Sequence, residues 1–256
     1  MTLEYDGTAF NGSQLQPGVR TVQAELERAV GKLTGQPENE RVVVNLAGRT
    51  DTGVHAAGQV ANFKTASHHS LVTFERGLNA NLPFDIAVTA AHEVEDRFHA
   101  RFSAIERCYE YSILNRLVRS ALTRRYATLV TEPLDLTALK LASAQLPGEH
   151  DFASFAGMGW GVKSDDEAAH VPVGKNLTLR RVEQAEWFGR GDLLIFRVAA
   201  NAFLPNMIRN LVGTLLLVGN GKLNLERFEE IFAACDRRQA GPTAPAQGLC
   251  LVQVKY

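Results

Sequence analysis

One succession of short strands and helices occurs twice in the 256 residues, and this repetition restricts the fold more than any other feature of the sequence. In the first half, apolar residues at helical spacing predict an amphipathic helix at 19–33, with Thr21 as a good N-cap. Consecutive β-branched residues predict a buried strand at 41–47, which stops at a glycine-containing loop, 48–58. The other elements expected in this half are a helix with Leu71, Phe74 and Leu78 and strands near 85–91 and 105–114.

The second half repeats this order of elements. A helix is predicted near 135–146, and apolar strands on either side of 188–192 predict a hairpin. Two helices follow, one over about 205–218 and one behind Asn224. The last strand, 249–254, is largely apolar on both faces, so we expect it in the centre of a sheet.

The two halves meet near residues 115–130 and predict an α+β fold of two related lobes. We divide the chain into a lobe of residues 1–115 and a lobe of residues 116–256. A concave seam between lobes is a common place for a site, so we expect a cleft there. The polar, glycine-containing segment 157–175 is predicted to be a mobile loop.

The composition excludes several classes of protein. No run approaches the roughly 20 apolar residues that span a membrane, and no leader pattern is present, so we expect a soluble, cytoplasmic protein. The three cysteines are far apart and the seven histidines are scattered. Neither a disulfide framework nor a metal site is therefore expected.

A net charge of −1 argues against coating nucleic acid by bulk attraction but leaves a local basic groove open. Arginines are unevenly distributed along the chain. Solvated arginines and a phosphate-binding surface explain this pattern about equally well. The clusters are Arg97, Arg101 and Arg107, then Arg116, Arg119, Arg124 and Arg125, then Arg237 and Arg238.

The decapeptide 47–56, directly after the predicted buried strand, is the strongest candidate in the sequence for a group of catalytic residues. It holds the carboxylate of Asp51 among small residues, with Arg49 two positions away, and a rigid sheet positions such loop residues well. An ordinary Asp-Thr-Gly turn is an equally good interpretation of these residues. Aspartic proteases also use Asp-Thr-Gly, but they need two such carboxylates, and only a symmetric dimer could supply a second one here.

The whole decapeptide resembles the catalytic motif Gly-Arg-Thr-Asp-x-Gly-Val-His of the tRNA pseudouridine synthase A family. The match is long and unusual, and further matching segments occur in the same order along nearly the whole chain. These segments are 4–8, 79–83, 98–104, 109–111, 150–155, 201–204, 207–213 and 248–252.

The resemblance implies two ferredoxin-like lobes that share a continuous, antiparallel-rich sheet with a central cleft. It also implies a homodimer that isomerises uridines 38, 39 and 40 in the anticodon stem-loop of tRNA. Such an isomerase needs neither a metal nor an organic cofactor, because the reaction is redox-neutral. No membrane and no other protein partner are implied; a non-catalytic RNA-binding protein is the alternative in which tRNA is bound but not changed.

Specific residues receive roles from the same resemblance. Asp51 is the catalytic aspartate, and Arg209 lies opposite it as a cationic partner. Tyr109 stacks on the target base, and its hydroxyl could help to remove the proton from carbon 5. Arg49 enters the space that the extruded uridine leaves. The remaining substrate-binding residues are Leu249, which forms an apolar wall of the uracil pocket, together with Thr50, Gly53, His55 and Asn201.

Plainer interpretations of three of these residues stay open. Arg209 belongs to a narrow polar stripe on an apolar helix, which would usually face solvent and would equally suit a buried ion pair. Tyr109 could be an ordinary half-buried strand tyrosine. Leu249 would look like core in any case.

The chain departs from the family pattern at a few positions. In the segment 10–16, Ser13 stands where the family has a large aromatic residue. Pro205 and Asn206 replace other polar residues, and the segment 157–175 is longer than usual. None of these changes touches Asp51, so we expect them to affect RNA affinity rather than the reaction.

Overall fold

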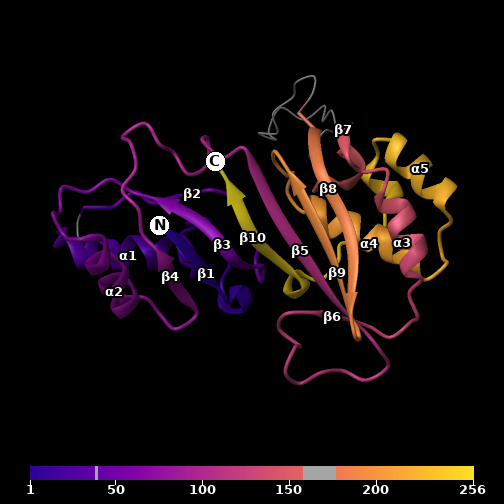
Figure 1. Cartoon of the computed structure of the whole chain (residues 1–256), viewed down its shortest axis with the longest axis horizontal. Coiled ribbons are helices and arrows are strands. Elements are labelled where there is room, and N and C mark those ends of the chain that lie inside the picture. Colours follow the sequence, from indigo (N-terminus) through magenta and orange to yellow (C-terminus); the bar gives the residue numbers. More distant parts are fainter. Residues whose placement is uncertain (38–39, 158–176) are drawn as a thin grey trace. The chain divides into compact units, whose positions relative to one another are not determined.

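A computed structural model describes residues 1–37, 40–157 and 177–256 of the chain. These residues form a mixed α+β fold with a ten-stranded, mostly antiparallel open sheet, as the sequence predicts (Figure 1). They divide into two compact units: Met1–Cys108 with Cys250–Tyr256, and Tyr109–Leu249. The loop predicted at 157–175 lies outside the described residues from 158 onward. In the described part of the chain, no helix is both long and apolar enough to cross a membrane.

The first unit packs two helices against its strands. The helix α1, Val22–Thr34, begins where the sequence predicts, because the hydroxyl of Thr21 accepts a hydrogen bond from the Ala24 amide. The helix α2, Leu71–Asn81, lies beside α1 and is capped in the same way by Ser70. Leu26 and Leu78, one from each helix, are fully buried in the core. The strands of this unit are β1 (Thr2–Tyr5), β2 (Asn45–Leu46), β3 (His55–Asn62), β4 (Ile86–Ala90) and β10 (Leu249–Lys255).

The predicted buried strand at 41–47 is wrong in most of its length, since only Asn45–Leu46 pairs as a strand. Val42 and Val44 are buried, but Val43 between them is 54% exposed. The backbone of Val44 bonds to side chains of α1: its N–H donates to Glu27 and its carbonyl accepts from Gln23. The extended segment therefore rests on a helix instead of pairing with a neighbouring strand.

The second unit is built around a long hairpin whose two-residue turn contains Gly191 at φ 61°. Its three helices contact one another, and α3 packs against β8 (Figure 1). The helix α3 is shorter than predicted, and α4 begins at Met207, two residues after Pro205. The elements are β5 (Glu106–Asn115), β6 (Thr128–Val130), α3 (Leu136–Ser143), β7 (Gly148–Asp151), β8 (Leu179–Arg190), β9 (Leu193–Ala200), α4 (Met207–Gly219) and α5 (Leu225–Ala233).

The last strand, β10, has the central place that its apolar sequence predicts. The strand order is β4-β1-β3-β10-β5-β9-β8-β7, with β2 beside β3 and β6 beside β5. β10 runs parallel to β3, with Cys250 opposite His55 and Leu251 opposite Ala56. Leu251 is fully buried. Residues from the far end of the chain thus complete the unit that contains the Asp51 loop.

Candidate active site

The Asp51 loop is an extended segment that ends in a tight turn. The amide of Val54 donates to the carbonyl of Asp51 at 3.1 Å, and Gly53 adopts φ 80°, a value that favours glycine. Side chains alternate before the turn: Arg49 is exposed, Thr50 is buried and Asp51 is half-buried. Arginine and aspartate therefore stay open to a ligand while the threonine between them anchors the loop.

Ser13 holds the backbone of Thr50 by two hydrogen bonds. The Thr50 amide donates to the Ser13 hydroxyl at 2.8 Å, and the Ser13 amide donates to the Thr50 carbonyl at 3.0 Å. Ser13 is fully buried and Thr50 nearly so. The peptide groups on both sides of Thr50 therefore have fixed partners directly before Asp51.

Gln59 holds Gly48 in a corresponding way, two residues earlier. Its side-chain amide donates to the Gly48 carbonyl at 2.9 Å, and its side-chain oxygen accepts from the Gly48 amide at 3.3 Å. Gln59 lies in β3 and is fully buried. Two buried polar side chains thus restrain alternate residues of the segment 48–50.

The hydroxyl of Tyr5 joins the two restraints. It lies 2.8 Å from the Thr50 hydroxyl oxygen and accepts from the Gln59 amide at 3.3 Å. Burial raises the pKa of Tyr5 to about 12, although hydrogen bonds with Thr50, Gln59 and Ser13 act in the opposite direction. Tyr5 is consequently a neutral hydrogen-bonding group at physiological pH.

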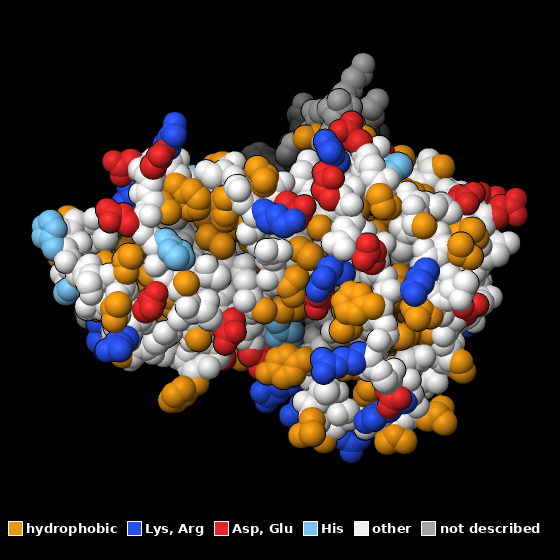
Figure 2. All heavy atoms as spheres, viewed as in Figure 1, with side chains coloured by type: hydrophobic (Ala, Val, Ile, Leu, Met, Phe, Trp, Pro, Cys, Tyr) orange, Lys and Arg blue, Asp and Glu red, His pale blue; other side chains and the backbone are white. Residues whose placement is uncertain are grey.

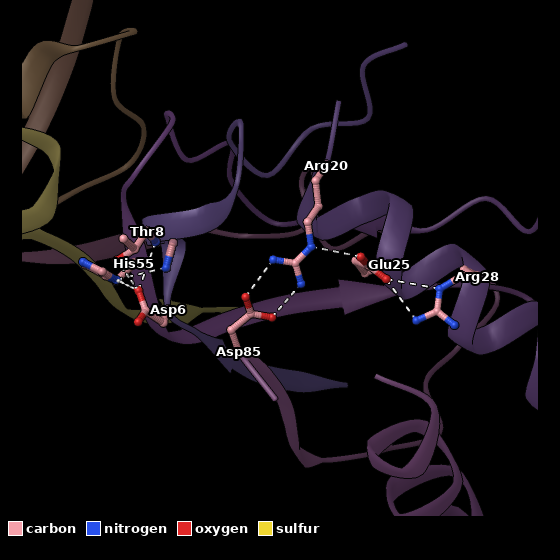
Figure 3. A network of polar contacts seen from close by, with 8 residues as sticks. Asp6, Thr8, Arg20, Glu25, Arg28, His55 and Asp85 are labelled. Atoms are coloured by element: carbon pink, nitrogen blue, oxygen red, sulfur yellow. Dashed lines mark hydrogen bonds and ion pairs between the residues drawn. The ribbon is translucent and has the colours of Figure 1, made fainter. Parts of the chain in front are cut away.

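His55 connects the far end of the loop to the short segment that follows β1. Its Nδ1 accepts from the Gly7 amide at 3.0 Å. Asp6 lies 3.3 Å from the same nitrogen and accepts from the amide of Thr8 (Figure 3). A Cβ on Gly7 would lie 2.0 Å from the carbonyl oxygen of Val54, so only glycine permits this close approach. His55 is 4% exposed and acts here as a structural anchor.

Arg20 holds the segment between Ser13 and α1 in place. Its guanidinium makes two hydrogen bonds of 2.8 Å to Asp85 and one of 3.1 Å to Glu25 (Figure 3). The hydrogen bonds with Asp85 raise the pKa of Arg20 above its usual value. The guanidinium also lies 4.2 Å from the centre of the Phe10 ring. This bidentate pair connects the residue before the N-cap of α1 to the residue directly before β4.

A second group of arginines surrounds the start of the loop. Arg107 donates to the carbonyls of Ala47 and Arg101, which connects the loop to the segment 98–104. Partial burial, and then the positive charge of Arg101, lower the pKa of Arg49. The effect of Arg101 on this pKa shows that the two cations lie near one another, an arrangement that suits a polyanionic ligand.

The other predicted site residues belong to the second unit. Tyr109, in β5, is 7% exposed, and its ring meets Phe203 edge to face at 5.2 Å. Leu249 is 5% exposed. Asn201 is exposed, and its side chain accepts from the amides of Arg181 and Ala202 at the end of the hairpin.

The polar stripe of α4 does not face solvent. Arg209 donates to the Ala244 carbonyl at 2.8 Å and to the Asn206 side chain at 2.9 Å, while its own carbonyl accepts from the Ala244 amide. Asn210 is 1% exposed and donates to two carbonyls of the segment 153–156. The polar residues of the stripe therefore bind neighbouring segments of the chain. The contacts with Ala244 and Asn206 set the direction of the Arg209 guanidinium.

The clustered arginines serve different purposes. Arg237 donates to the carbonyls of Ala240 and Gly241, and Arg238 pairs with Asp236, so this cluster is structural. Between β5 and β6, by contrast, basic and apolar side chains point outward together, over the lower part of the view in Figure 2. The large apolar side chains exposed there are Leu117, Val118, Leu122 and Tyr126, beside the exposed Arg119 and Arg124.

The sequence singles out the charged residues of the loop, Asp51 and Arg49, but not the residues that hold the loop. From the sequence, Ser13 stands out only as a departure from the family pattern, and Tyr5 and Gln59 receive no role. One signal was available for Gln59: it is a polar residue between small and apolar neighbours in a β-forming stretch.

Comparison with known proteins identifies a family. A family model described as tRNA pseudouridine synthase matches residues 1–103 and 142–256. tRNA pseudouridine synthase A of Chloroflexus aurantiacus is 46% identical over 256 residues, which cover all of this chain and 87% of that protein. The Roseiflexus castenholzii protein of the same name is also 46% identical, with 89% of its length covered. The Nitrosococcus oceani protein of that name is 44% identical over 99% of this chain and 92% of its own length.

Proposed function

Because the chain belongs to the tRNA pseudouridine synthase family, we propose that it converts uridine to pseudouridine at positions 38, 39 and 40 of the tRNA anticodon stem-loop. Enzymes of this family isomerise uridine in RNA, so the chain is an isomerase rather than an aspartic protease. The three positions are supported by the motif resemblance of residues 47–56 and of the segments that match in the same order.

We propose that Asp51 is the nucleophile or base of this reaction. The observation that carries the proposal is the loop geometry: a half-buried aspartate follows a backbone that is hydrogen-bonded on both sides of Thr50. A catalytic group must be held closely in place, and the restraints on this segment supply that property. The reaction breaks the bond from ribose C1′ to uracil N1, forms one from C1′ to C5, and transfers the C5 proton away while N1 gains one.

The other proposed roles follow the resemblance. Arg209 is the cationic partner of Asp51, and Tyr109 and Leu249 form the walls in which the freed uracil turns. Their burial and the aromatic contact of Tyr109 with Phe203 suit an apolar, aromatic pocket. Thr50, Gly53, His55 and Asn201 are proposed to complete the set of substrate-binding residues.

Arg49 is proposed to occupy the space of the extruded uridine. A base inside a helical stem is inaccessible, and flipping it out costs a few kcal/mol. Arg49 is exposed and lies near Arg101, so a cationic surface is available to the RNA backbone. We further propose a cytoplasmic homodimer without a cofactor, in agreement with the same resemblance.

The test is the variant Asp51→Asn, assayed with unmodified tRNA and chemical mapping of pseudouridine. The amide keeps the size of the side chain but can act neither as a nucleophile nor as a base. We expect kcat to fall by roughly 10³-fold or more, with tRNA affinity retained. Asp96→Asn is the matched control, because its side chain is fully exposed and lies 3.9 Å from Lys64.

Two results would contradict the assignment. Pseudouridine formation by Asp51→Asn at the wild-type rate would remove Asp51 from the reaction. Binding of tRNA by the wild-type protein without any isomerisation would indicate a protein that only binds RNA.

A further inference from the structure

Each polar group of Ser13 has a hydrogen-bond partner. Its hydroxyl oxygen accepts from the Thr50 amide at 2.8 Å, and its own amide donates to the Thr50 carbonyl at 3.0 Å. Its carbonyl accepts from the Gln23 amide at 3.0 Å. Because Ser13 is fully buried, water cannot take over the hydroxyl's role without a rearrangement of the site.

The backbone around Ser13 is shaped for this contact. Gly12 has φ +84°, and a Cβ there would lie 2.9 Å from the Thr50 carbonyl oxygen. Only glycine lets the two segments approach so closely without strain. The close approach brings the small Ser13 side chain within hydrogen-bond distance of the Thr50 amide.

Ser13 is itself anchored to the start of α1. The amides of Val22 and Gln23 donate to the carbonyls of Gly12 and Ser13, and the amide of Asn11 donates to the carbonyl of Arg20. Arg20 is held in turn by Asp85. Thr50 is thus connected, through Ser13, to a helix and to a bidentate ion pair, and these restrain its position.

The consequence for Asp51 follows from its place in the chain. On its C-terminal side, the turn to Val54 restrains it. On its N-terminal side, Thr50 carries the nearest restraints, and the next ones lie at Gly48. Without the Ser13 hydroxyl, the Thr50 amide loses its acceptor and the peptide between Arg49 and Thr50 is less restrained, although the Thr50 carbonyl and hydroxyl keep their partners. A misplacement of about 1 Å can reduce a rate by about 10²-fold.

We propose that Ser13 is a positioning residue, which directs the Asp51 carboxylate by fixing the peptide groups on both sides of Thr50. This inference rests on the proposed function of Asp51. It assigns a purpose to a position that the motif comparison alone treats as a departure from the family pattern.

The experiment compares kcat, KM and the melting temperature of Ser13→Cys and Ser13→Ala with the wild type. Cysteine keeps a weak acceptor of similar shape, whereas alanine removes the acceptor. We expect kcat to fall in the order Ser, Cys, Ala, by roughly 10- to 100-fold for alanine, with KM for tRNA changed by less than about twofold. If the alanine variant does not fold, the cysteine variant alone must show the split between kcat and KM.

Ser143→Ala is the matched control. Ser143 is 1% exposed and accepts from the Trp187 indole at 2.8 Å, so alanine there also leaves a buried donor without its partner. We expect a similar fall in melting temperature for Ser143→Ala but an unchanged kcat. Wild-type kcat in both Ser13 variants, or equal kcat losses at Ser13 and Ser143, would overturn the positioning role. A wild-type protein that makes no pseudouridine would instead overturn the proposed function.

Discussion

Two buried tyrosines do similar work in the two units. The hydroxyl of Tyr5 lies 2.8 Å from that of Thr50, and the hydroxyl of Tyr111 lies 2.7 Å from that of Thr128. Tyr111 also donates to the Pro245 carbonyl at 2.7 Å. Burial raises the pKa of each tyrosine to about 12, so both are neutral hydrogen-bonding groups at physiological pH.

These pKa values predict how stability depends on alkaline pH. The pKa is near 10 in the unfolded chain and about 12 in the folded one, so stability is unaffected below pH 10 and is lost as pH rises from 10 through 12. Tyr111→Phe removes one of the groups, and the free energy of unfolding should then fall less steeply over this range. Urea unfolding from pH 8 to pH 12 measures the difference.

The same variant has an effect at pH 8. Loss of the hydroxyl should reduce stability by about 1 kcal/mol, because the Thr128 and Pro245 oxygens lose a partner. Equal slopes for wild type and Tyr111→Phe above pH 10 would show that this tyrosine does not titrate differently in the two states.

At the residue scale, the sequence indicates the candidate reactive residues but not the residues that hold them in place. Asp51 and Arg49 are visible because they are neighbours in a dense motif. Ser13 and Gln59 are not, since their bonds to Thr50 and Gly48 join residues 37 and 11 positions apart. A hydrogen bond between distant segments leaves no periodic pattern in the sequence.

Helical glycines differ in what surrounds them. In α4, a Cβ on Gly213 would lie 1.7 Å from the carbonyl oxygen of Pro242, so the segment that bonds to Arg209 packs directly on the helix backbone. In α1, a Cβ on Gly31 would meet its nearest atom, on Val42, at 3.8 Å, an ordinary contact. Intrinsic helix propensity favours alanine at both positions, but packing excludes it at Gly213.

Alanine substitutions at these two positions should therefore change stability in opposite directions. Gly31→Ala is expected to stabilise the protein by up to ~1 kcal/mol, from propensity and a less flexible unfolded chain. Gly213→Ala is expected to destabilise it by ~2 kcal/mol or more, because backbone must move. Urea unfolding of both variants provides the measurement. A stabilised Gly213→Ala would contradict the close packing on α4.

At the element scale, helix starts were predicted best. Thr21 and Asn224 cap α1 and α5 as expected, because a capping side chain bonds to an amide only a few residues away. The strand at 41–47 was wrong because Glu27 and Gln23 supply the hydrogen bonds that a strand neighbour would give. A run of β-branched residues indicates a buried, extended segment but does not identify the groups that hydrogen-bond to its backbone.

At the scale of the whole molecule, one unit is continuous in sequence and the other is not. Tyr109–Leu249 is a single stretch, whereas Met1–Cys108 is completed by Cys250–Tyr256. β10 contributes the fully buried Leu251 and pairs with β3, which begins at His55. The sequence predicted two lobes and a central last strand. It did not predict that this strand completes the first unit, because apolarity on both faces of a strand does not identify the neighbouring strands.

Deletion of residues 250–256 should unfold the first unit selectively. Without β10, one edge of β3 loses its parallel partner and the core loses Leu251. Amide hydrogen exchange should show lost protection in β3 and retained protection in the hairpin of β8 and β9. Deletion of Tyr256 alone is the control, since it removes a hydrogen bond to the Ala100 carbonyl and a ring contact with Phe98 but leaves β10 in place. Intact protection of β3 after the longer deletion would contradict this dependence.

The split unit also has a consequence for biosynthesis. A ribosome makes residues 1–108 first, yet they must wait for residues 250–256, while the intervening 109–249 are complete sooner and can fold first. The two units therefore fold in the reverse of the order in which their synthesis begins, and the unit that contains the Asp51 loop is completed last. A nascent chain that stops before residue 250 would carry the whole motif 47–56 without the strand that completes its unit, so we expect premature termination to release an incompletely folded protein.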